Sequence, residues 1–284
     1  LDVAIFPELG MDGRVFTLAA TRLAAVQCAG WGHPTTTGLS SIDYFLSSSA
    51  MEPEDAAKHY SEGLVLLPGI GTNYRPPPPP ARASRGDFGL REQANLYLLP
   101  QSPFKIHPDN DALLLDILER DPLAVLVLVH GPDQSMSKQL VERLERVANS
   151  RSMDVAGQIQ VVPEQARDRY LALNACCDVM LDTLHWSGGN ASLDALHAHL
   201  PIVTLPGALM RGRQSAAMLR ELGLDELVVD NPGAYVQLAV EVASNREYNQ
   251  SLRDRIADRV VDLCAQQEPL TALTEFVGKL DTRP

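Results

Sequence analysis

A glycine pair in the middle of the chain, Gly188 and Gly189, has the setting of a phosphate-binding turn. It follows a short apolar run and precedes a helical pattern that starts at Asn190-Ala191 and carries Asp194. The first turn of a helix offers unpaired backbone N–H groups and the positive end of the helix dipole, and glycine lets a ligand approach the backbone closely. Asp194 is placed to hold a ribose hydroxyl. The alternative is an ordinary strand-to-helix turn capped by Asn190, with no ligand.

Basic side chains follow other expected strands of the same region and supply the charge that a phosphate site needs. Lys105, Arg167 and Arg213 come after the first, third and fifth of these strands. Open α/β domains bind their ligands at the edge where the carboxyl ends of parallel strands meet. Lys105 and Arg167 beside the glycine pair therefore predict a site for a nucleotide diphosphate. Taken singly, each has an alternative: a solvated loop lysine, or an arginine paired with an acidic neighbour on its own helix.

His33 lies in the loop 32–38, which is dense in threonine hydroxyls. A histidine there can donate to a phosphate or a sugar hydroxyl, or act as a general base. An ordinary loop histidine is an equally good interpretation. The chain has no Ser-His-Asp set with a nucleophile elbow, no Walker A sequence and no HExxH. The loop after the strand at 95–100 lacks a glycine-rich dinucleotide fingerprint, which argues against an NAD or FAD enzyme.

Alternating strands and helices position these residues and predict an α/β fold with parallel sheets. Six strands form a Rossmann-like series at 95–100, 124–131, 159–163, 179–182, 201–206 and 226–230. The helices between them are expected near 109–120, 135–149, 166–177, 190–200 and 213–223. A smaller unit before them has strands at 1–7, 25–34, 42–49 and 62–68 and helices at 14–25 and 52–60.

Five consecutive prolines, 76–80, mark the boundary between the two units, because proline forces an extended segment without ladder donors. We therefore expect a partial N-terminal Rossmann-like domain over 1–75, a proline-rich linker over 76–90, a complete Rossmann-like domain over 91–234, and packing helices over 235–284. A rigid surface loop within one domain is the alternative interpretation of the prolines. Leu1 falls inside the first expected strand, so we expect the chain to be a fragment.

The charge of the chain excludes some partners. There are 24 basic and 36 acidic side chains, a net charge of −12, which argues against binding to nucleic acid or to an anionic membrane. No apolar run is long enough to span a bilayer. The four cysteines show no metal-ligand spacing, so we expect reduced thiols and a cytoplasmic location.

An ordered set of motifs resembles the catalytic region of the O-GlcNAc transferase and Spindly-type glycosyltransferases, particularly the bacterial members. The motifs are QCAGWGHPTTTG at 27–38, IDY at 42–44, YSE at 60–62, QSPFK at 101–105, DVMLDT at 178–183, and VTLPG at 203–207 with Arg213. The resemblance covers nearly the whole chain. It implies an inverting GT-B glycosyltransferase, in which two Rossmann-like domains face each other across a cleft and the C-terminal one holds a UDP-sugar.

The resemblance also implies roles for individual residues. Lys105 matches the lysine that contacts the diphosphate, Arg167 a basic residue near the uracil, and Asp194 the ribose carboxylate. The full set expected to bind the nucleotide-sugar is Gln101, Ser102, Lys105, Arg167, Gly188, Gly189, Asn190, Ala191, Asp194 and Arg213. His33 and Lys105 are the candidates for stabilising the leaving diphosphate. No cofactor and no metal is expected, since the UDP-sugar is a substrate.

Some residues depart from the family's pattern. Animal members have His-Thr-Thr where this chain has Gly189-Asn190-Ala191, so the phosphates would have to be bound through backbone N–H groups. Tyr170 stands in the place of a nucleotide-side histidine. Tetratricopeptide repeats, the first half of the N-terminal domain and the family's upstream histidine are absent from this sequence. The fragment is therefore expected to bind UDP or a UDP-sugar, and it could be inactive alone.

We predict transfer of a sugar, GlcNAc or a related hexose, from a UDP-sugar to a Ser or Thr hydroxyl of a protein, with inversion. The expected partners are the UDP-sugar donor and a protein acceptor, without nucleic acid or membrane. Two alternatives stay open. One is a non-catalytic UDP-sugar-binding or protein-interaction module, and the other is transfer to an Asn amide, as in the related adhesin glucosyltransferases.

Overall fold

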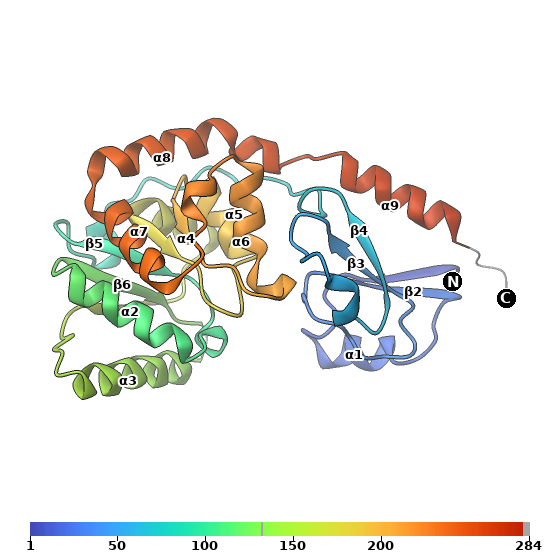
Figure 1. Cartoon of the computed structure of the whole chain (residues 1–284), viewed down its shortest axis with the longest axis horizontal. Helices are drawn as coiled ribbons and strands as arrows, with labels where there is room; N and C mark the ends of the chain where they lie inside the picture. The colour runs from blue at the N-terminus through green and yellow to red at the C-terminus, as the bar shows by residue number, and fades with distance from the viewer. Residues whose placement is uncertain (132, 281–284) are drawn as a thin grey trace.

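The computed structural model of the chain describes residues 1–131 and 133–280, so residues 281–284 of the expected C-terminal segment lie outside it. Two parallel sheets form separate lobes, and the described helices surround them (Figure 1). This arrangement confirms the predicted α/β class with two parallel-sheet lobes. None of the described helices is both long and apolar enough to cross a membrane.

The N-terminal sheet has four strands in the order β1-β2-β3-β4: Val3–Phe6, Val26–Gly30, Tyr44–Ser48 and Gly63–Leu67. The helix α1, Gly13–Ala19, is shorter than the range 14–25 predicted for it. It ends early because the buried amide of Gln27 donates to the carbonyls of Ala19 and Thr21 and accepts from the N–H of Leu23, which wraps the chain around that side chain.

The helix predicted over 52–60 is wrong; only the short 3-10 helix η1, Ala56–His59, forms there. The buried Glu52 carboxylate accepts a hydrogen bond from the Tyr60 hydroxyl at 2.5 Å. That bond draws the two ends of the segment together into a compact turn, which a regular helix of this length would hold apart.

The C-terminal sheet has the order β7-β6-β5-β8-β9. Its strands are β5 (Asn95–Leu99), β6 (Ala124–Val129), β7 (Ile159–Val162), β8 (Val179–Leu181) and β9 (Ile202–Val203). The helices α2 to α6 are Asp109–Arg120, Gln134–Ser150, Arg167–Cys176, Asn190–His197 and Gln214–Glu221. The sixth strand predicted at 226–230 is wrong: Val228 makes one isolated bridge to Thr204, next to the 3-10 helix η5, Asp225–Leu227. Since β9 is only two residues long, it cannot pair with a further strand over several residues.

The strand order places the topological switch point between β5 and β8. From β5 the chain first builds outward through β6 and β7, and it then returns to the other side of β5 with β8 and β9. A crevice opens at such a point beyond the carboxyl ends of the two strands, and ligands of open α/β sheets bind there.

The helices after residue 231 serve both lobes. α7, Pro232–Ser244, packs on α2 and β5, and α8, Arg246–Arg259, packs on α7. The last helix, α9 (Glu268–Lys279), extends across to the N-terminal sheet (Figure 1). There Leu273 and Phe276 cover the sheet face formed by residues such as Cys28 and Leu46.

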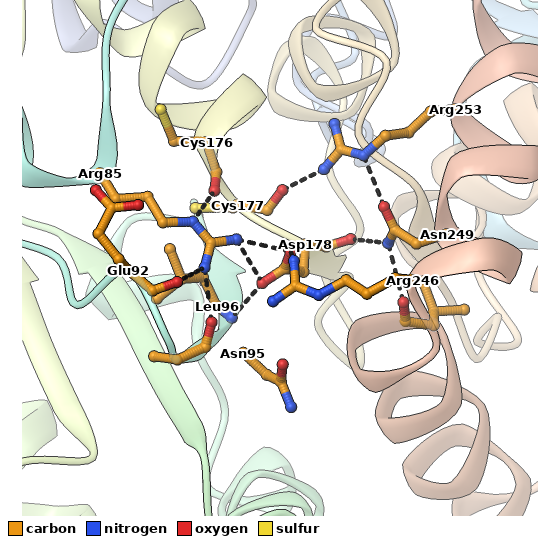
Figure 2. Close-up of polar contacts among 12 residues, drawn as sticks. Arg85, Glu92, Asn95, Leu96, Cys176, Cys177, Asp178, Arg246, Asn249 and Arg253 are labelled. Atoms are coloured by element: carbon orange, nitrogen blue, oxygen red, sulfur yellow. Dashed lines mark hydrogen bonds and ion pairs between the residues drawn. The ribbon is translucent and has the colours of Figure 1, made fainter.

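A cluster of arginines fastens the end of the proline-rich segment and α8 to the C-terminal sheet (Figure 2). The Arg85 guanidinium forms a bidentate ion pair with the buried Asp178 carboxylate, at 2.8 and 2.9 Å, and it also donates to three backbone carbonyls. From α8, Asn249 donates to the Asp178 carbonyl and Arg253 to the Cys177 carbonyl. Arg85 begins the 3-10 helix η2 (Arg85–Phe88), so this part of the predicted linker is docked on the C-terminal lobe.

Candidate functional site

Lys105 and Trp186 meet at the switch point. Lys105 ends the 3-10 helix η3 (Pro103–Lys105) after β5, and Trp186 lies in the loop after β8. The Lys105 ammonium lies 5.3 Å from the centre of the Trp186 ring, a cation–π contact. Burial lowers the pKa of Lys105. An incoming anion would offset that desolvation, so this lysine is well placed to receive a diphosphate.

His33 approaches the same tryptophan from the N-terminal lobe. Its ring lies 5.5 Å, centre to centre, from the ring of Trp186. Burial lowers the pKa of His33, and the positive charge of Lys105 lowers it further, so the neutral imidazole is favoured. Gly10, at φ +113°, permits this packing because a Cβ there would lie 2.5 Å from the His33 ring. The two predicted catalytic residues therefore face each other across the lobes, around a tryptophan that the sequence analysis did not select.

The Glu62 carboxylate holds the threonine-rich loop that carries His33 through hydrogen bonds. The Glu62 carboxylate accepts from the Thr36 hydroxyl at 2.7 Å and from the Thr37 N–H at 2.8 Å, and it also accepts from the Thr37 hydroxyl. These hydrogen bonds lower the pKa of Glu62 against the opposing effect of its burial. Two of the three hydroxyls thus fix the loop, which leaves His33 as its candidate contact with a ligand.

Asp182 organises the loop between β8 and α5. Its fully buried carboxylate accepts from the hydroxyls of Ser187 and Thr204, both at 2.7 Å, and from the Gly188 N–H at 2.8 Å. Burial raises the pKa of Asp182, and these hydrogen bonds oppose that effect. The sequence offered one signal for this role: a carboxylate directly after an apolar strand, with small hydroxyl residues nearby.

The glycine pair begins α5, with Gly189 at the N-cap position and Asn190 as the first helical residue. Asn190 is therefore not the helix cap that the alternative interpretation required. Gly188 serves packing, because a Cβ there would lie 2.2 Å from the Ser192 hydroxyl. Gly189 and Ala191 are half-buried and Asn190 is exposed. Since glycine has no capping side chain, backbone N–H groups of this helix start are available to an anion.

Arg167 and Asp194 form a pair one turn further along α5. The Arg167 guanidinium, at the start of α4, makes a bidentate ion pair with the buried Asp194 carboxylate. The Tyr74 hydroxyl donates to the same carboxylate at 3.4 Å. The alternative pairing of Arg167 with an acidic neighbour on its own helix is wrong, because the partner lies 27 residues away. The Arg167–Asp194 pair, with Tyr74 beside it, is thus formed within the protein itself and could bind a ribose hydroxyl.

The remaining predicted residues lie around this core. Gln101 is buried and its amide donates to the Trp186 carbonyl at 3.4 Å, whereas Ser102 is exposed. Arg213 donates to the carbonyls of Gly207 and Met51, at 3.1 and 3.2 Å, and so joins the two lobes. Arg213 is thus engaged with backbone in this structure.

A cavity of about 220 Å³ lies between the lobes. It is lined by Pro34, Thr35, Thr36, His59, Tyr60, Leu209, Met210 and Arg211. The first five come from the N-terminal lobe, beginning with the residue after His33, and the last three precede Arg213. The space between the lobes therefore includes a pocket beside the His33 loop, lined by both polar and apolar side chains.

Residues 71–265 match the sequence profile of glycosyl transferase family 41. The chain belongs to this family. The family 41 chain is 29% identical over 251 residues to the probable UDP-N-acetylglucosamine–peptide N-acetylglucosaminyltransferase SPINDLY of Arabidopsis thaliana. The aligned region covers 84% of this chain and 26% of that protein. The probable transferase SEC of the same plant is 27% identical over 241 residues, 82% of this chain and 24% of that protein. The chain thus spans about a quarter of the length of these relatives.

A solved structure extends the match to the N-terminal lobe. A mutant of the O-GlcNAc transferase of Thermobaculum terrenum superposes with a TM-score of 0.80 and 27% identity, over 97% of the family 41 chain and 51% of that chain. The resemblance inferred from the motifs is confirmed. The roles of the individual site residues stay predictions. Sequence reasoning missed Trp186, Asp182 and Tyr74, of which the first two lie inside the stretch around the glycine pair.

Proposed function

We propose that the protein transfers a sugar from a UDP-sugar to a protein hydroxyl. The observation that carries this proposal is the meeting of His33 and Lys105 around Trp186, which joins the two lobes at the switch point. The names of the relatives support GlcNAc as the sugar. We propose Ser or Thr as the acceptor and inversion as the stereochemical outcome.

The chemistry of the leaving group explains the arrangement. Transfer breaks the bond between the sugar and the diphosphate and leaves a negative charge on UDP, so positive groups must be in place before the bond breaks. We propose that Lys105 and the backbone N–H groups of the 189–191 helix start take this charge, without a metal. Asp194, Tyr74 and Arg167 would hold the ribose and the uracil. Neutral His33 can donate one hydrogen bond and accept another at the sugar end of the cleft.

We also propose that the protein acts in the cytoplasm and binds neither nucleic acid nor membrane. Each of the four cysteines is a free thiol, which fits a reducing compartment. The net charge of −12 disfavours anionic polymers and lipid surfaces.

The test is incubation with labelled UDP-GlcNAc and a protein lysate. We expect label on protein side chains, released under conditions that cleave O-linked sugars, and loss of label in a Lys105→Ala, Asp194→Ala double variant. The matched control is Lys138→Ala, Asp116→Ala, which removes an exposed lysine and a surface aspartate that form ion pairs elsewhere. Labelling that persists in the double variant would refute the site, and label on Asn would select the amide alternative. UDP binding without labelling would select the non-catalytic module.

A further inference from the structure

Three metal-ligating side chains converge beside the switch point, outside the residues assigned to the nucleotide. His107 and Asp109 lie between η3 and the first turn of α2, and His185 precedes Trp186 in the loop after β8. His185 Nε2 lies 2.7 Å from one carboxylate oxygen of Asp109, and His107 Nδ1 lies 3.3 Å from the other. All three ligand atoms lie within 4.8 Å of one another.

A buried amide fixes the backbone beneath this cluster. Asn110 is 3% exposed; its Nδ2 donates to the His107 carbonyl and its Oδ1 accepts from the Leu184 N–H, both at 2.9 Å. One side chain thus sets the distance between the two loops that carry the three ligands. His185 itself has φ +69°, an uncommon conformation for a residue with a Cβ, which persists where the surroundings hold it. The backbone around the cluster, and not the three side chains alone, therefore holds His107, Asp109 and His185 close together.

The donor set selects a class of cation. Two imidazole nitrogens and a carboxylate suit zinc and related first-row transition metals, whereas magnesium and calcium favour sites made of oxygen alone. Ligand atoms on one tetrahedral zinc ion lie roughly 3.3 Å apart, given bond lengths of about 2.0–2.1 Å. Rotations of these side chains, each about half-exposed, would bring the three atoms to that separation and leave a position for water. For His107 the rotation replaces the hydrogen bond that Nδ1 accepts from the Asp109 N–H at 3.2 Å.

We propose that His107, Asp109 and His185 bind one transition-metal ion, with zinc as the natural occupant. The ion would act as a clamp and take no part in sugar transfer. It would join the loop after β5, which carries Lys105, to the loop after β8, which carries Trp186. The competing explanation is a plain hydrogen-bonded cluster, with Asp109 favoured at the helix N-terminus by the helix dipole.

Calorimetric titration of the nucleotide-free chain with ZnCl2 separates these explanations, and it does not depend on the proposed function. We expect one zinc per chain. His185→Asn should lower the zinc affinity by at least about tenfold, because even the loss of a residue that only hydrogen-bonds to a metal ligand lowers metal affinity roughly 10–100-fold. Asparagine tolerates positive φ, so the loop keeps its backbone in this variant. Asp109→Asn is the second variant, and His130→Ala, which removes a histidine outside the cluster, is the matched control.

The zinc titration has one result that supports the site and two that overturn it. Stoichiometric zinc binding that weakens in His185→Asn and Asp109→Asn and persists in His130→Ala supports the site. No zinc binding by the unsubstituted chain, or equal binding by all four proteins, overturns it. Hydrogen exchange gives an independent readout: zinc should slow exchange in the loops 103–110 and 183–188 of the unsubstituted chain and leave it unchanged in His185→Asn. Slowing of equal size in both proteins would contradict the clamp.

Discussion

In the proposed reaction Lys105 stabilises the negative charge of the leaving diphosphate, and its environment distinguishes it from a surface lysine. The ammonium lies under the Trp186 ring and is half-buried, so it has given up part of its hydration. A hydrogen bond from such a group to a phosphate is charge-assisted and worth roughly 1.5–3 kcal/mol. The surface lysine Lys138, by contrast, is largely exposed.

We predict that Lys105→Ala weakens UDP binding by at least about tenfold, the lower end of that range. Isothermal titration calorimetry with UDP measures the change, with Lys138→Ala as the control that keeps wild-type affinity. Equal UDP affinity in Lys105→Ala and Lys138→Ala would remove Lys105 from the site.

The pKa of His33 provides a second prediction at the residue scale. Burial and the charge of Lys105 both lower it, so Lys105→Ala should raise the pKa of His33 while burial still keeps it below 6.5. An NMR titration of the imidazole measures this shift. An unchanged pKa would mean that the two residues do not face each other in solution.

The same shift sets a pH dependence of folding. A lowered pKa means that the unfolded chain binds a proton more readily than the folded chain. The contribution of His33 to stability is therefore complete above about pH 6.5. It decreases as the pH falls toward the lower pKa of the folded state.

At the scale of elements, the site depends on how loops and helix ends are fastened to the C-terminal sheet. Asp182 shapes the loop after β8 from inside, and Asn110 ties that loop to the start of α2. On the opposite side, before β8 begins, Asp178 receives Arg85 (Figure 2). Both carboxylates are buried and both are satisfied by several donors, so removing one donor leaves a costly group behind.

We predict that Arg85→Ala lowers the free energy of unfolding by about 3 kcal/mol, because the buried Asp178 carboxylate loses its bidentate partner. This is the lower end of the range for a broken buried ion pair, since Arg246 still contacts the carboxylate at 3.3 Å. Arg151→Ala is the matched control. It removes a more exposed arginine paired with Asp116 and should cost less than about 1 kcal/mol. Chemical denaturation measures both values. A cost for Arg85→Ala no larger than that of the control would show that the Arg85–Asp178 ion pair contributes little to stability.

At the scale of the whole molecule, the last helix couples the ends of the chain. α9 leaves the C-terminal lobe and covers the sheet of the N-terminal lobe, where the ring of Phe276 packs edge-on against Tyr44 at 5.1 Å. The N-terminal lobe, which carries His33, thus packs against a segment far away in the sequence. Arg213 adds a second tie through the Met51 carbonyl.

We predict that Phe276→Ala destabilises the N-terminal lobe by about 1–2 kcal/mol, less than the 3–5 kcal/mol of a fully buried phenylalanine because Phe276 is only half-buried. Native-state hydrogen exchange should show faster exchange in β2, β3 and β4 and unchanged exchange in β5 and β6. Leu270→Ala, at an exposed position of the same helix, is the control. Uniform acceleration in both lobes would contradict a local role of α9.

Local sequence patterns were enough to predict the α/β class, the strands β1 to β9 of the described residues, the helix at 109–120 and the set of residues at strand ends. These follow from local patterns of apolar residues and from the rule that parallel strands present their carboxyl ends together. The sequence also determined the family, since the motifs occur in order along the chain.

Which of these residues meet depends on long-range contacts that appear only in the folded chain. The Arg167–Asp194 pair, the Trp186 contact shared by His33 and Lys105, and the Asn110 tie between loops all join residues tens of positions apart. The same cause explains the wrong elements at 52–60 and 226–230. Tyr60 reaching back to Glu52, and a neighbouring strand only two residues long, override the local pattern. Local propensity is worth tenths of a kcal/mol per residue, so a few buried polar contacts are enough to reverse it.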